Sequence, residues 1–194
     1  RYINQQPVKM AEFEAALRMI KPFMNGEEVT WNDKELQLKW VRPELPEIEM
    51  HVAGYGPKAL AVAGRVGDGV IIQGPCHNPT GIDPHIDDWK ALGALAKEKG
   101  LLVMLDVAYH GFAQSLDRDM DGVRAFMAEA GEAMVAYSCS KNFGLYRERT
   151  GVLIALTSPD RKAVVQGKLN FLNRQNYSFP PDHGARLVTM ILED

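Results

Sequence analysis

The sequence predicts an α/β protein built in three layers, with helices flanking a mostly parallel sheet. Apolar runs typical of strands alternate along the chain with stretches whose apolar residues recur at helical spacing. Residues 48–73 have the pattern of a strand, a short helix and a second strand, for which parallel pairing is expected. The run from Leu101 to Leu105 is apolar throughout, as in strands that are covered on both faces.

The first third of the chain predicts a helix, a β-hairpin and this β-α-β unit. One helix face carries apolar residues at i, i+3, i+4 and i+7, namely Phe13, Ala16, Leu17 and Ile20. This helix should run up to Pro22 and end by Gly26. Alternation around Asn32-Asp33 predicts a hairpin through Val29, Trp31, Leu36, Leu38 and Trp40. The β-α-β unit should comprise a strand over 48–53, a helix over 58–63 and a strand over 69–73.

Strands and helices continue to alternate in the remaining two thirds. We expect Asp83 to cap a helix that has Pro84 at its first position and ends at Gly100. Its buried stripe should consist of Ile86, Trp89, Leu92 and Ala96. After a strand that ends in Asp106, the pattern predicts helices over 123–130, 161–173 and 182–193, and strands over 133–138 and 152–156.

The composition is that of a globular protein and argues against several classes of partner. Apolar residues make up 46% and charged residues 24% of the chain. The net charge of -3 gives no electrostatic reason to expect nucleic acid or an anionic membrane as a partner. No apolar run approaches the roughly 20 residues of a membrane-spanning helix. The cysteines Cys76 and Cys139 do not suggest a disulfide framework, so we expect a cytoplasmic location.

The ends of the chain also carry a prediction. The sequence begins with Arg1 rather than methionine, and it stops at Asp194 directly after an apolar helical pattern. We therefore expect a fragment of a longer protein.

Four polar clusters lie at the ends of predicted strands. In open α/β sheets, ligands bind at the carboxyl ends of the strands. Each cluster alone is a weak signal, because Asn-Pro-Thr-Gly is usually a turn and a lysine after a strand is usually a surface charge. In chain order, the clusters are His77-Asn78-Pro79-Thr80-Gly81, Asp106 with Tyr109, Ser138-Cys139-Ser140-Lys141, and Glu148-Arg149-Thr150-Gly151.

In order and spacing, these clusters resemble the aspartate and aromatic aminotransferases, fold type I enzymes that depend on pyridoxal 5′-phosphate (PLP). The resemblance covers residues 74–194 and includes Ser138-Cys139-Ser140-Lys141-Asn142-Phe143-Gly144. It implies a PLP-transferase large-domain core that transfers an amino group between an amino acid, aspartate or aromatic, and a 2-oxo acid. A homodimer is also implied, because the sites of this family form between subunits.

The resemblance assigns roles around the cofactor ring. Lys141 would form the Schiff base with PLP and move the α-proton of the substrate. Asp106 would keep the pyridine nitrogen protonated, because a nearby carboxylate raises its pKa. Asn78 and Tyr109 would hydrogen-bond the phenolic oxygen of the cofactor.

A serine and two arginines would hold anionic groups. Ser138 and Arg149 match the positions that bind the cofactor phosphate, for which the planar arginine fork is suited. Arg174 matches a position that reaches into the neighbouring subunit to hold the distal carboxylate of a substrate, although a cation at a helix end has the same pattern. Phe179 departs from the family pattern, in which asparagine is usual at this position.

Three further residues beside these clusters are interpreted as structural, because a histidine or cysteine that flanks a turn is more often structural than catalytic. They are Cys76, His77 and His110. No metal site is predicted.

Residues 1–73 do not share the aminotransferase resemblance. The glycine-rich phosphate loop and the stacking aromatic residue that precede Asn-Pro-Thr-Gly in that family are not found. The segments 53–60 and 63–70 instead resemble luciferase-like monooxygenases and F420-dependent reductases, which are TIM barrels. This implies a barrel-derived β-α-β segment in which Gly54 and Gly56 present backbone amides to the phosphate of FMN or F420.

The two resemblances meet in one strand, which predicts a domain over 1–73, a domain over 74–194 and a sheet that both could share. Such a junction indicates a chimera, made by design or recombination, or an error of sequence assembly. Three hypotheses stay open. The first is a PLP-dependent aminotransferase core, impaired without its phosphate loop and the small domain that supplies an arginine for the substrate α-carboxylate. The others are a fragment of a flavin- or F420-dependent oxidoreductase and a non-catalytic chimera.

Overall fold

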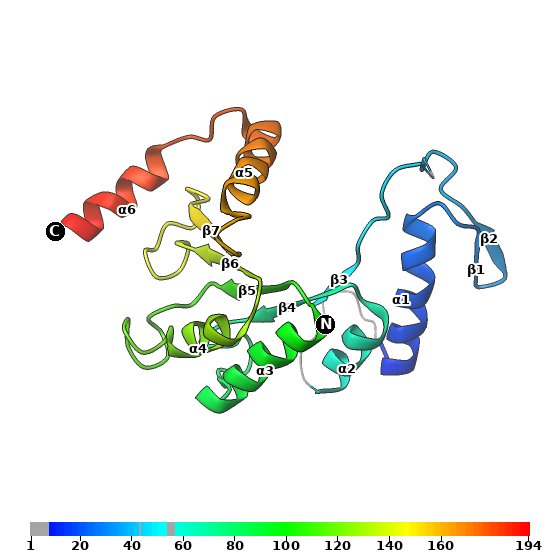
Figure 1. The fold of residues 1–194 in the computed structure, drawn as a ribbon, viewed down its shortest axis with the longest axis horizontal. Coiled ribbons are helices and arrows are strands. Elements are labelled where there is room, and N and C mark those ends of the chain that lie inside the picture. The colour runs from blue at the N-terminus through cyan, green and yellow to red at the C-terminus, as the bar shows by residue number, and fades with distance from the viewer. Residues whose placement is uncertain (1–7, 43, 54–56) are drawn as a thin grey trace. The chain divides into compact units, whose positions relative to one another are not determined.

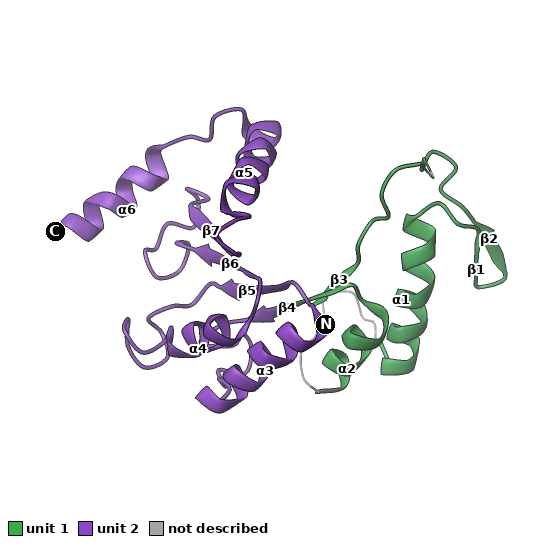
Figure 2. Cartoon of the chain, in the orientation of Figure 1, with its two compact units in different colours: residues 1–71 green, residues 72–194 purple. Residues whose placement is uncertain are grey.

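The computed structural model describes residues 8–42, 44–53 and 57–194, and the chain divides into two compact units. Unit 1 comprises residues 1–71 and unit 2 comprises residues 72–194, drawn in green and purple in Figure 2. Figure 1 labels the helices and strands in chain order.

Unit 1 holds a helix, a hairpin and a β-α-β unit, in the order that the sequence predicts. The elements are α1 (Met10–Met24), β1 (Val29–Trp31), β2 (Lys34–Leu36), β3 (His51–Ala53), α2 (Pro57–Val66) and β4 (Gly69–Gln73), the last of which ends in unit 2. β1 and β2 pair antiparallel, whereas β3 and β4 pair in parallel. The core of this unit is formed by Phe13, Leu17, Ile20, Met50, Val52, Val62, Ala63, Val66 and Val70.

The ends of these elements differ from the prediction. Strand β2 stops before Leu38, whose carbonyl instead accepts the Val41 N–H in a turn, so the predicted extension to Trp40 is wrong. Strand β3 is shorter than the predicted 48–53, because the Ile48 N–H donates to the side chain of Asn25 rather than to a strand. Helix α2 is longer than the predicted 58–63.

The central sheet has five strands in the order β3-β4-β5-β6-β7. Its remaining strands are β5 (Val103–Val107), β6 (Ala133–Ser138) and β7 (Gly151–Leu156). β5 and β6 pair in parallel, and β7 runs antiparallel to β6. The α/β fold with a mostly parallel sheet and flanking helices is thereby confirmed.

Helices α3 (Ile86–Lys99) and α4 (Asp121–Glu129) pack on β5 and β6 and form the core of unit 2. Trp89 of α3 and Phe126 of α4 meet edge to face, with ring centres 6.4 Å apart. Along β5, buried side chains alternate with the half-buried side chains of Met104 and Asp106. The prediction of a strand covered on both faces is therefore wrong, because in this chain the two helices bury only one face of β5.

The start of α3 corrects three further predictions. The helix begins at Ile86 rather than at Pro84, and the Asp88 carboxylate accepts the N–H of the preceding residue, His85. Asp83 does not cap this helix, because its carboxylate accepts the N–H of Cys76. Ile86 lies in the first turn and is exposed, so it does not belong to the buried stripe.

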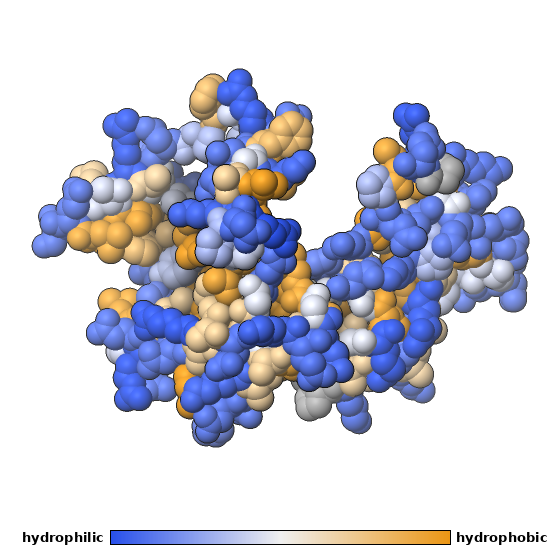
Figure 3. Space-filling model, viewed as in Figure 1, coloured by the Kyte–Doolittle hydropathy of each residue, from blue (hydrophilic) through white to orange (hydrophobic). Residues whose placement is uncertain are grey.

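The C-terminal helices, α5 (Lys162–Tyr177) and α6 (His183–Glu193), expose most of their apolar residues. Helix α6 is anchored at its first turn, where Gly184 lies so close to Thr150 that a β-carbon would not fit. The exposed apolar side chains of the two helices include Val164, Phe171, Leu172, Met190, Ile191 and Leu192. Apolar surface over α6 is visible in Figure 3. Within the ranges described, no helix combines the length and the apolarity that crossing a membrane requires.

Candidate active site

The predicted site residues lie around one edge of the sheet. Asn78 follows β4, Tyr109 follows β5 and Lys141 follows β6. Arg149 precedes β7, whose first residue lies opposite Ser138, the last residue of β6. The carboxyl ends of parallel strands share an edge with the amino end of an antiparallel neighbour, so this topology gathers all four segments.

Three of these residues meet in the folded chain. The side-chain amide of Asn78 donates to the hydroxyl oxygen of Tyr109 over 2.9 Å. The Lys141 Nζ lies 4.9 Å from the centre of the Tyr109 ring, within the range of a cation–π contact. The Asn78 N–H donates to the side chain of Gln73, and the Asn78–Pro79 peptide bond is cis. The structure therefore assembles an amine, a phenol and an amide from three loops.

Asp106 lies on the half-buried face of β5, the face that α3 and α4 leave open. Its main-chain carbonyl accepts the Gly74 N–H over 2.7 Å, which ties the loop after β4 to β5. No donor among the described residues forms a hydrogen bond with the Asp106 carboxylate, so these residues leave its oxygens unoccupied.

Ser138 and Arg149 bond to main-chain groups nearby. The Ser138 hydroxyl accepts the Ser140 N–H, and the Arg149 guanidinium donates to the Tyr146 carbonyl over 3.1 Å. Arg149 has a φ of 53°, a left-handed conformation that costs a non-glycine residue on the order of 1–3 kcal/mol and recurs at functional sites. The roles of these two side chains as phosphate ligands stay predictions.

Arg174 lies in the last turn of α5, and its guanidinium carbon is 4.6 Å from the centre of the Phe179 ring. The arginine therefore stacks on the residue that departs from the family pattern. Its predicted role in a neighbouring subunit stays a prediction.

Two of the residues that are interpreted as structural, Cys76 and His77, have hydrogen-bond partners. Cys76 donates its N–H to Asp83, and the His77 Nδ1 lies 2.7 Å from the Thr80 hydroxyl. Burial raises the pKa of the Cys139 thiol, so this cysteine is held in its neutral form.

His110 takes part in a side-chain network that sequence analysis missed. It hydrogen-bonds the Tyr137 hydroxyl and the Leu116 carbonyl, and the Asn142 side chain donates to the same Tyr137 hydroxyl. Tyr137 is an aromatic residue with a polar hydroxyl near the end of an otherwise aliphatic run in β6, and this was the signal available in the sequence. Pattern alone does not reveal which loop such a hydroxyl reaches.

Asp119 was also missed, although it anchors the loop after Tyr109. Its buried carboxylate accepts four main-chain N–H groups over 2.7 to 3.1 Å, from Gly111, Ala113, Gln114 and Ser115. Burial pushes the pKa of Asp119 upward, but the four bonds to the charged form outweigh it and hold the pKa below its ordinary value.

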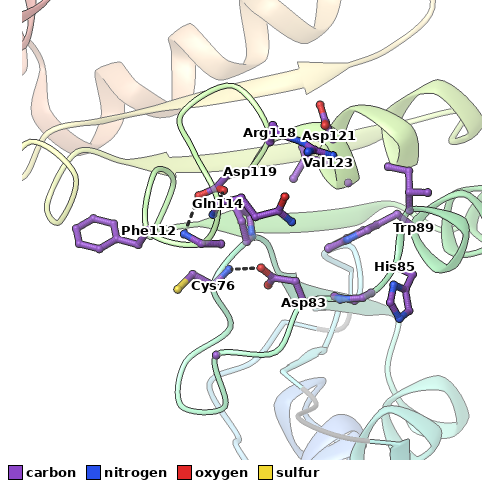
Figure 4. Close-up of a pocket in the computed structure, with 16 residues that line it drawn as sticks. Cys76, Asp83, His85, Trp89, Phe112, Gln114, Arg118, Asp119, Asp121 and Val123 are labelled. Carbon is purple, nitrogen blue, oxygen red and sulfur yellow. Dashed lines mark hydrogen bonds between the residues drawn. The ribbon is translucent and has the colours of Figure 1, made fainter.

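A cavity of about 710 Å³ lies between the loop after β4 and the residues that lead into α4 (Figure 4). Its lining includes Cys76, Asp83, Trp89, Phe112, Gln114 and Arg118. One oxygen of Asp83 accepts the Cys76 N–H, whereas the other is buried and has no hydrogen bond to the described residues. Asn78, Tyr109 and Lys141 do not line this cavity, so it is distinct from the predicted site.

A mostly parallel α/β sheet that presents a lysine, a tyrosine and an aspartate at one edge is the arrangement expected of the aminotransferase class. Residues 54–194 match the family Aminotransferase class I and II. Because this match covers more than half of the chain, the chain belongs to that family.

Curated relatives agree with this assignment. The aromatic-amino-acid aminotransferase of Paracoccus denitrificans is 45% identical over 138 residues, which are 71% of this chain and 35% of the relative. The aspartate aminotransferase of Escherichia coli (strain K12) is 47% identical over 132 residues, 67% of this chain and 33% of the relative. The chain therefore spans about a third of the length of these relatives.

Solved structures give the same result. An aromatic-amino-acid aminotransferase from Burkholderia pseudomallei, covalently bound to pyridoxal phosphate, is 38% identical with a TM-score of 0.64, covering 71% of this chain and 35% of that one. An aspartate aminotransferase from Trypanosoma cruzi is 38% identical with a TM-score of 0.60, covering 64% of this chain and 32% of that one.

The family match includes residues 54–73, the stretch that carries most of the resemblance to luciferase-like proteins. These comparisons do not support a luciferase-like fragment or a chimera. Gly54 and Gly56, the proposed contacts to FMN or F420, lie outside the described residues.

Proposed function

We propose that this chain is the lysine-bearing core of a PLP-dependent aminotransferase that exchanges an amino group between an aspartate-like or aromatic amino acid and a 2-oxo acid. The observation that carries the proposal is the meeting of Asn78, Tyr109 and Lys141 at the sheet edge. Membership of the aminotransferase family supports it.

The residues at this edge suit the chemistry of PLP. When bound, the cofactor supplies a ring that accepts electrons from the α-carbon of the substrate. Lys141 would supply the amine that a cofactor aldehyde requires and would move the proton at that α-carbon. The Asp106 carboxylate, half-buried and without a hydrogen bond from the described residues, suits a protonated ring nitrogen.

The hydroxyl of Tyr109 is oriented by its neighbour. The Tyr109 oxygen accepts a hydrogen bond from the Asn78 amide. The hydroxyl proton can therefore point away from Asn78 and donate to an anionic oxygen. Ser138 and Arg149 would bind the cofactor phosphate, with Arg149 exchanging its bond to the Tyr146 carbonyl for a charge-assisted one.

Labelling of Lys141 tests the proposal. The chain would be incubated with PLP, reduced with borohydride and digested, and the peptides would be weighed for an added pyridoxyl group. We expect the label on the peptide that contains Lys141, and we expect Lys141→Ala to remove at least about nine tenths of it. Lys168→Ala, at an exposed position of α5, is the matched control and should leave the label unchanged.

Two outcomes contradict the proposal. One is a label spread evenly over surface lysines such as Lys168, and the other is a labelling yield that Lys141→Ala does not reduce.

A further experiment distinguishes the two substrate classes. The labelled but unreduced chain is incubated with aspartate or with phenylalanine, and the amino acid that removes the label identifies the class.

Two finer parts of the proposal stay predictions. A homodimer in which Arg174 serves the neighbouring site rests on the resemblance, and a cytoplasmic location rests on the cysteine count. Elution volume in size-exclusion chromatography tests the homodimer.

The luciferase-like assignment of residues 1–73 stays a hypothesis that no comparison supports, and residues 54–73 fall within the aminotransferase match. A titration with FMN or F420 that leaves their fluorescence unchanged would remove it.

A further inference from the structure

A network of hydrogen bonds joins His110 and Asn142, the residues that directly follow Tyr109 and Lys141 in the sequence. The Asn142 amide and the His110 Nδ1 both meet the Tyr137 hydroxyl, the latter over 2.8 Å. The other ring nitrogen of His110 meets the Leu116 carbonyl. Each of the two proposed functional residues is therefore followed in sequence by a member of this network.

The donor and acceptor roles in the network follow from its two ends. The Asn142 Oδ1 accepts the Phe143 N–H, so the amide must present its NH₂ group to Tyr137. At the other end a carbonyl can only accept, so the His110 Nε2 must carry a proton. A neutral His110 then accepts at Nδ1 the single proton of the Tyr137 hydroxyl.

Tyr137 connects this network to the core. Its ring packs against the buried cluster of unit 2, and in β6 it lies opposite Val107 of β5. The His110 ring meets it edge to face, with centres 5.6 Å apart. Burial raises the pKa of the Tyr137 phenol, so the hydroxyl keeps the proton that the network requires.

We propose that Tyr137 and His110 are positioning residues that hold the loop of Lys141 at a fixed distance from the loop of Tyr109. The inference rests on the proposed function, because the position of the Lys141 amine matters for activity only if Lys141 reacts with the cofactor. Lysine has a flexible four-carbon side chain, and its contact with the Tyr109 ring requires both backbones to be held. Tyr137 bonds to both loops at once, through Asn142 and through His110.

The decisive variant is Tyr137→Phe, which removes the hydroxyl and retains the packed ring. In the cofactor-free chain, the side-chain protons of Lys141 should be shifted by the ring current of Tyr109, with Tyr109→Leu as the unshifted reference. We expect Tyr137→Phe to move the Lys141 shift toward that reference and to abolish the single His110 tautomer seen by nitrogen NMR. Tyr177→Phe, at an exposed position of α5, should change neither.

Reaction with PLP gives the second measurement. We expect Tyr137→Phe to slow pyridoxyl labelling of Lys141 by between about ten- and a hundredfold, as for other displaced reactive groups. Asn142→Ala, which breaks the network at the lysine side, should have a similar effect, and combining the two should add little. Asn142→Ala also serves as the test if Tyr137→Phe lowers the folded fraction measured by circular dichroism.

The inference is overturned if the Lys141 shift stays at its wild-type value in folded Tyr137→Phe, or if the two substitutions slow labelling independently. A wild-type chain that PLP does not label, but whose Lys141 shift still responds to Tyr137→Phe, would contradict the proposed function and leave the positioning role supported.

Discussion

Two regions of unit 2 differ in how they bury apolar surface. Around β5, β6, α3 and α4, residues such as Leu105 and Phe126 are fully buried in one cluster. Around β7, α5 and α6, side chains such as Ile154, Phe171 and Leu192 are exposed instead. Both regions combine an apolar strand pattern with helices that carry apolar residues at helical spacing, so the pattern alone does not separate them.

This difference divides the candidate site. Asp106, Tyr109 and Lys141 belong to the packed strands or to the loops directly after them. Arg149 and Arg174 belong to the less buried region. The core of this chain therefore positions the residues proposed to contact the cofactor ring, whereas the two arginines lie outside it.

The largest effect should come from the packed region. Phe126→Ala removes a ring with 0% exposure that meets Trp89 edge to face, and we expect a loss of about 3–5 kcal/mol in the free energy of unfolding. Phe171→Ala, on α5 with 58% exposure, is the matched control and should change that free energy by no more than about 0.5 kcal/mol. Urea denaturation measures both. Equal losses in the two variants would remove the distinction between the regions.

A smaller effect is expected at the loop of Tyr109. Asp119→Asn keeps the shape of the side chain but replaces a carboxylate that accepts four main-chain N–H groups, and we expect it to lower the free energy of unfolding by about 1–3 kcal/mol.

The same variant tests how the contribution of Asp119 to the free energy of unfolding depends on pH. Because the pKa of Asp119 is lower in the folded chain, the unfolded chain binds more protons. The stabilisation is therefore complete above the ordinary carboxyl pKa of about 3.9 and is lost as the pH falls through the lower folded pKa. Asp119→Asn should remove this part of the slope in acid denaturation, and an unchanged slope would show that the carboxylate does not stabilise the loop.

The smallest effect on stability is expected on α6. Met190→Gln with Leu192→Gln replaces two exposed apolar side chains by a polar residue of similar helix propensity. We expect the free energy of unfolding to change by less than about 0.5 kcal/mol, while binding of a hydrophobic dye decreases. A loss above about 1 kcal/mol would show that α6 is packed in solution, and the two regions would then be alike.

The order of the helices and strands can be predicted from the sequence, because helix and strand periodicities are local. The hairpin turn at Asn32-Asp33, the parallel β3-β4 pair and the end of α3 at Gly100 all follow from residues a few positions apart. The prediction failed at Asp83, where a distant N–H, that of Cys76, competes for the carboxylate that was expected to cap a helix.

The same division holds for the site. Lys141, Asp106 and Asn78 can be selected from the sequence, because each follows or ends a predicted strand in a recognisable motif. Their assembly depends on strand order, which brings Asn78 to Tyr109 and Lys141 to the Tyr109 ring. Tyr137 and Asp119 belong to no motif, and their roles come from contacts between loops that the sequence separates.

By itself, then, the sequence determined the α/β class, the chain positions of the reactive side chains and the family that they indicate, because residue type and spacing are properties of a linear chain. The tertiary structure alone decided which face of β5 is buried, which carboxylate holds the loop of Tyr109, and which tyrosine hydroxyl joins that loop to the loop of Lys141. Burial and hydrogen-bond partnership depend on distances across the fold, and neighbouring residues in the sequence do not determine those distances.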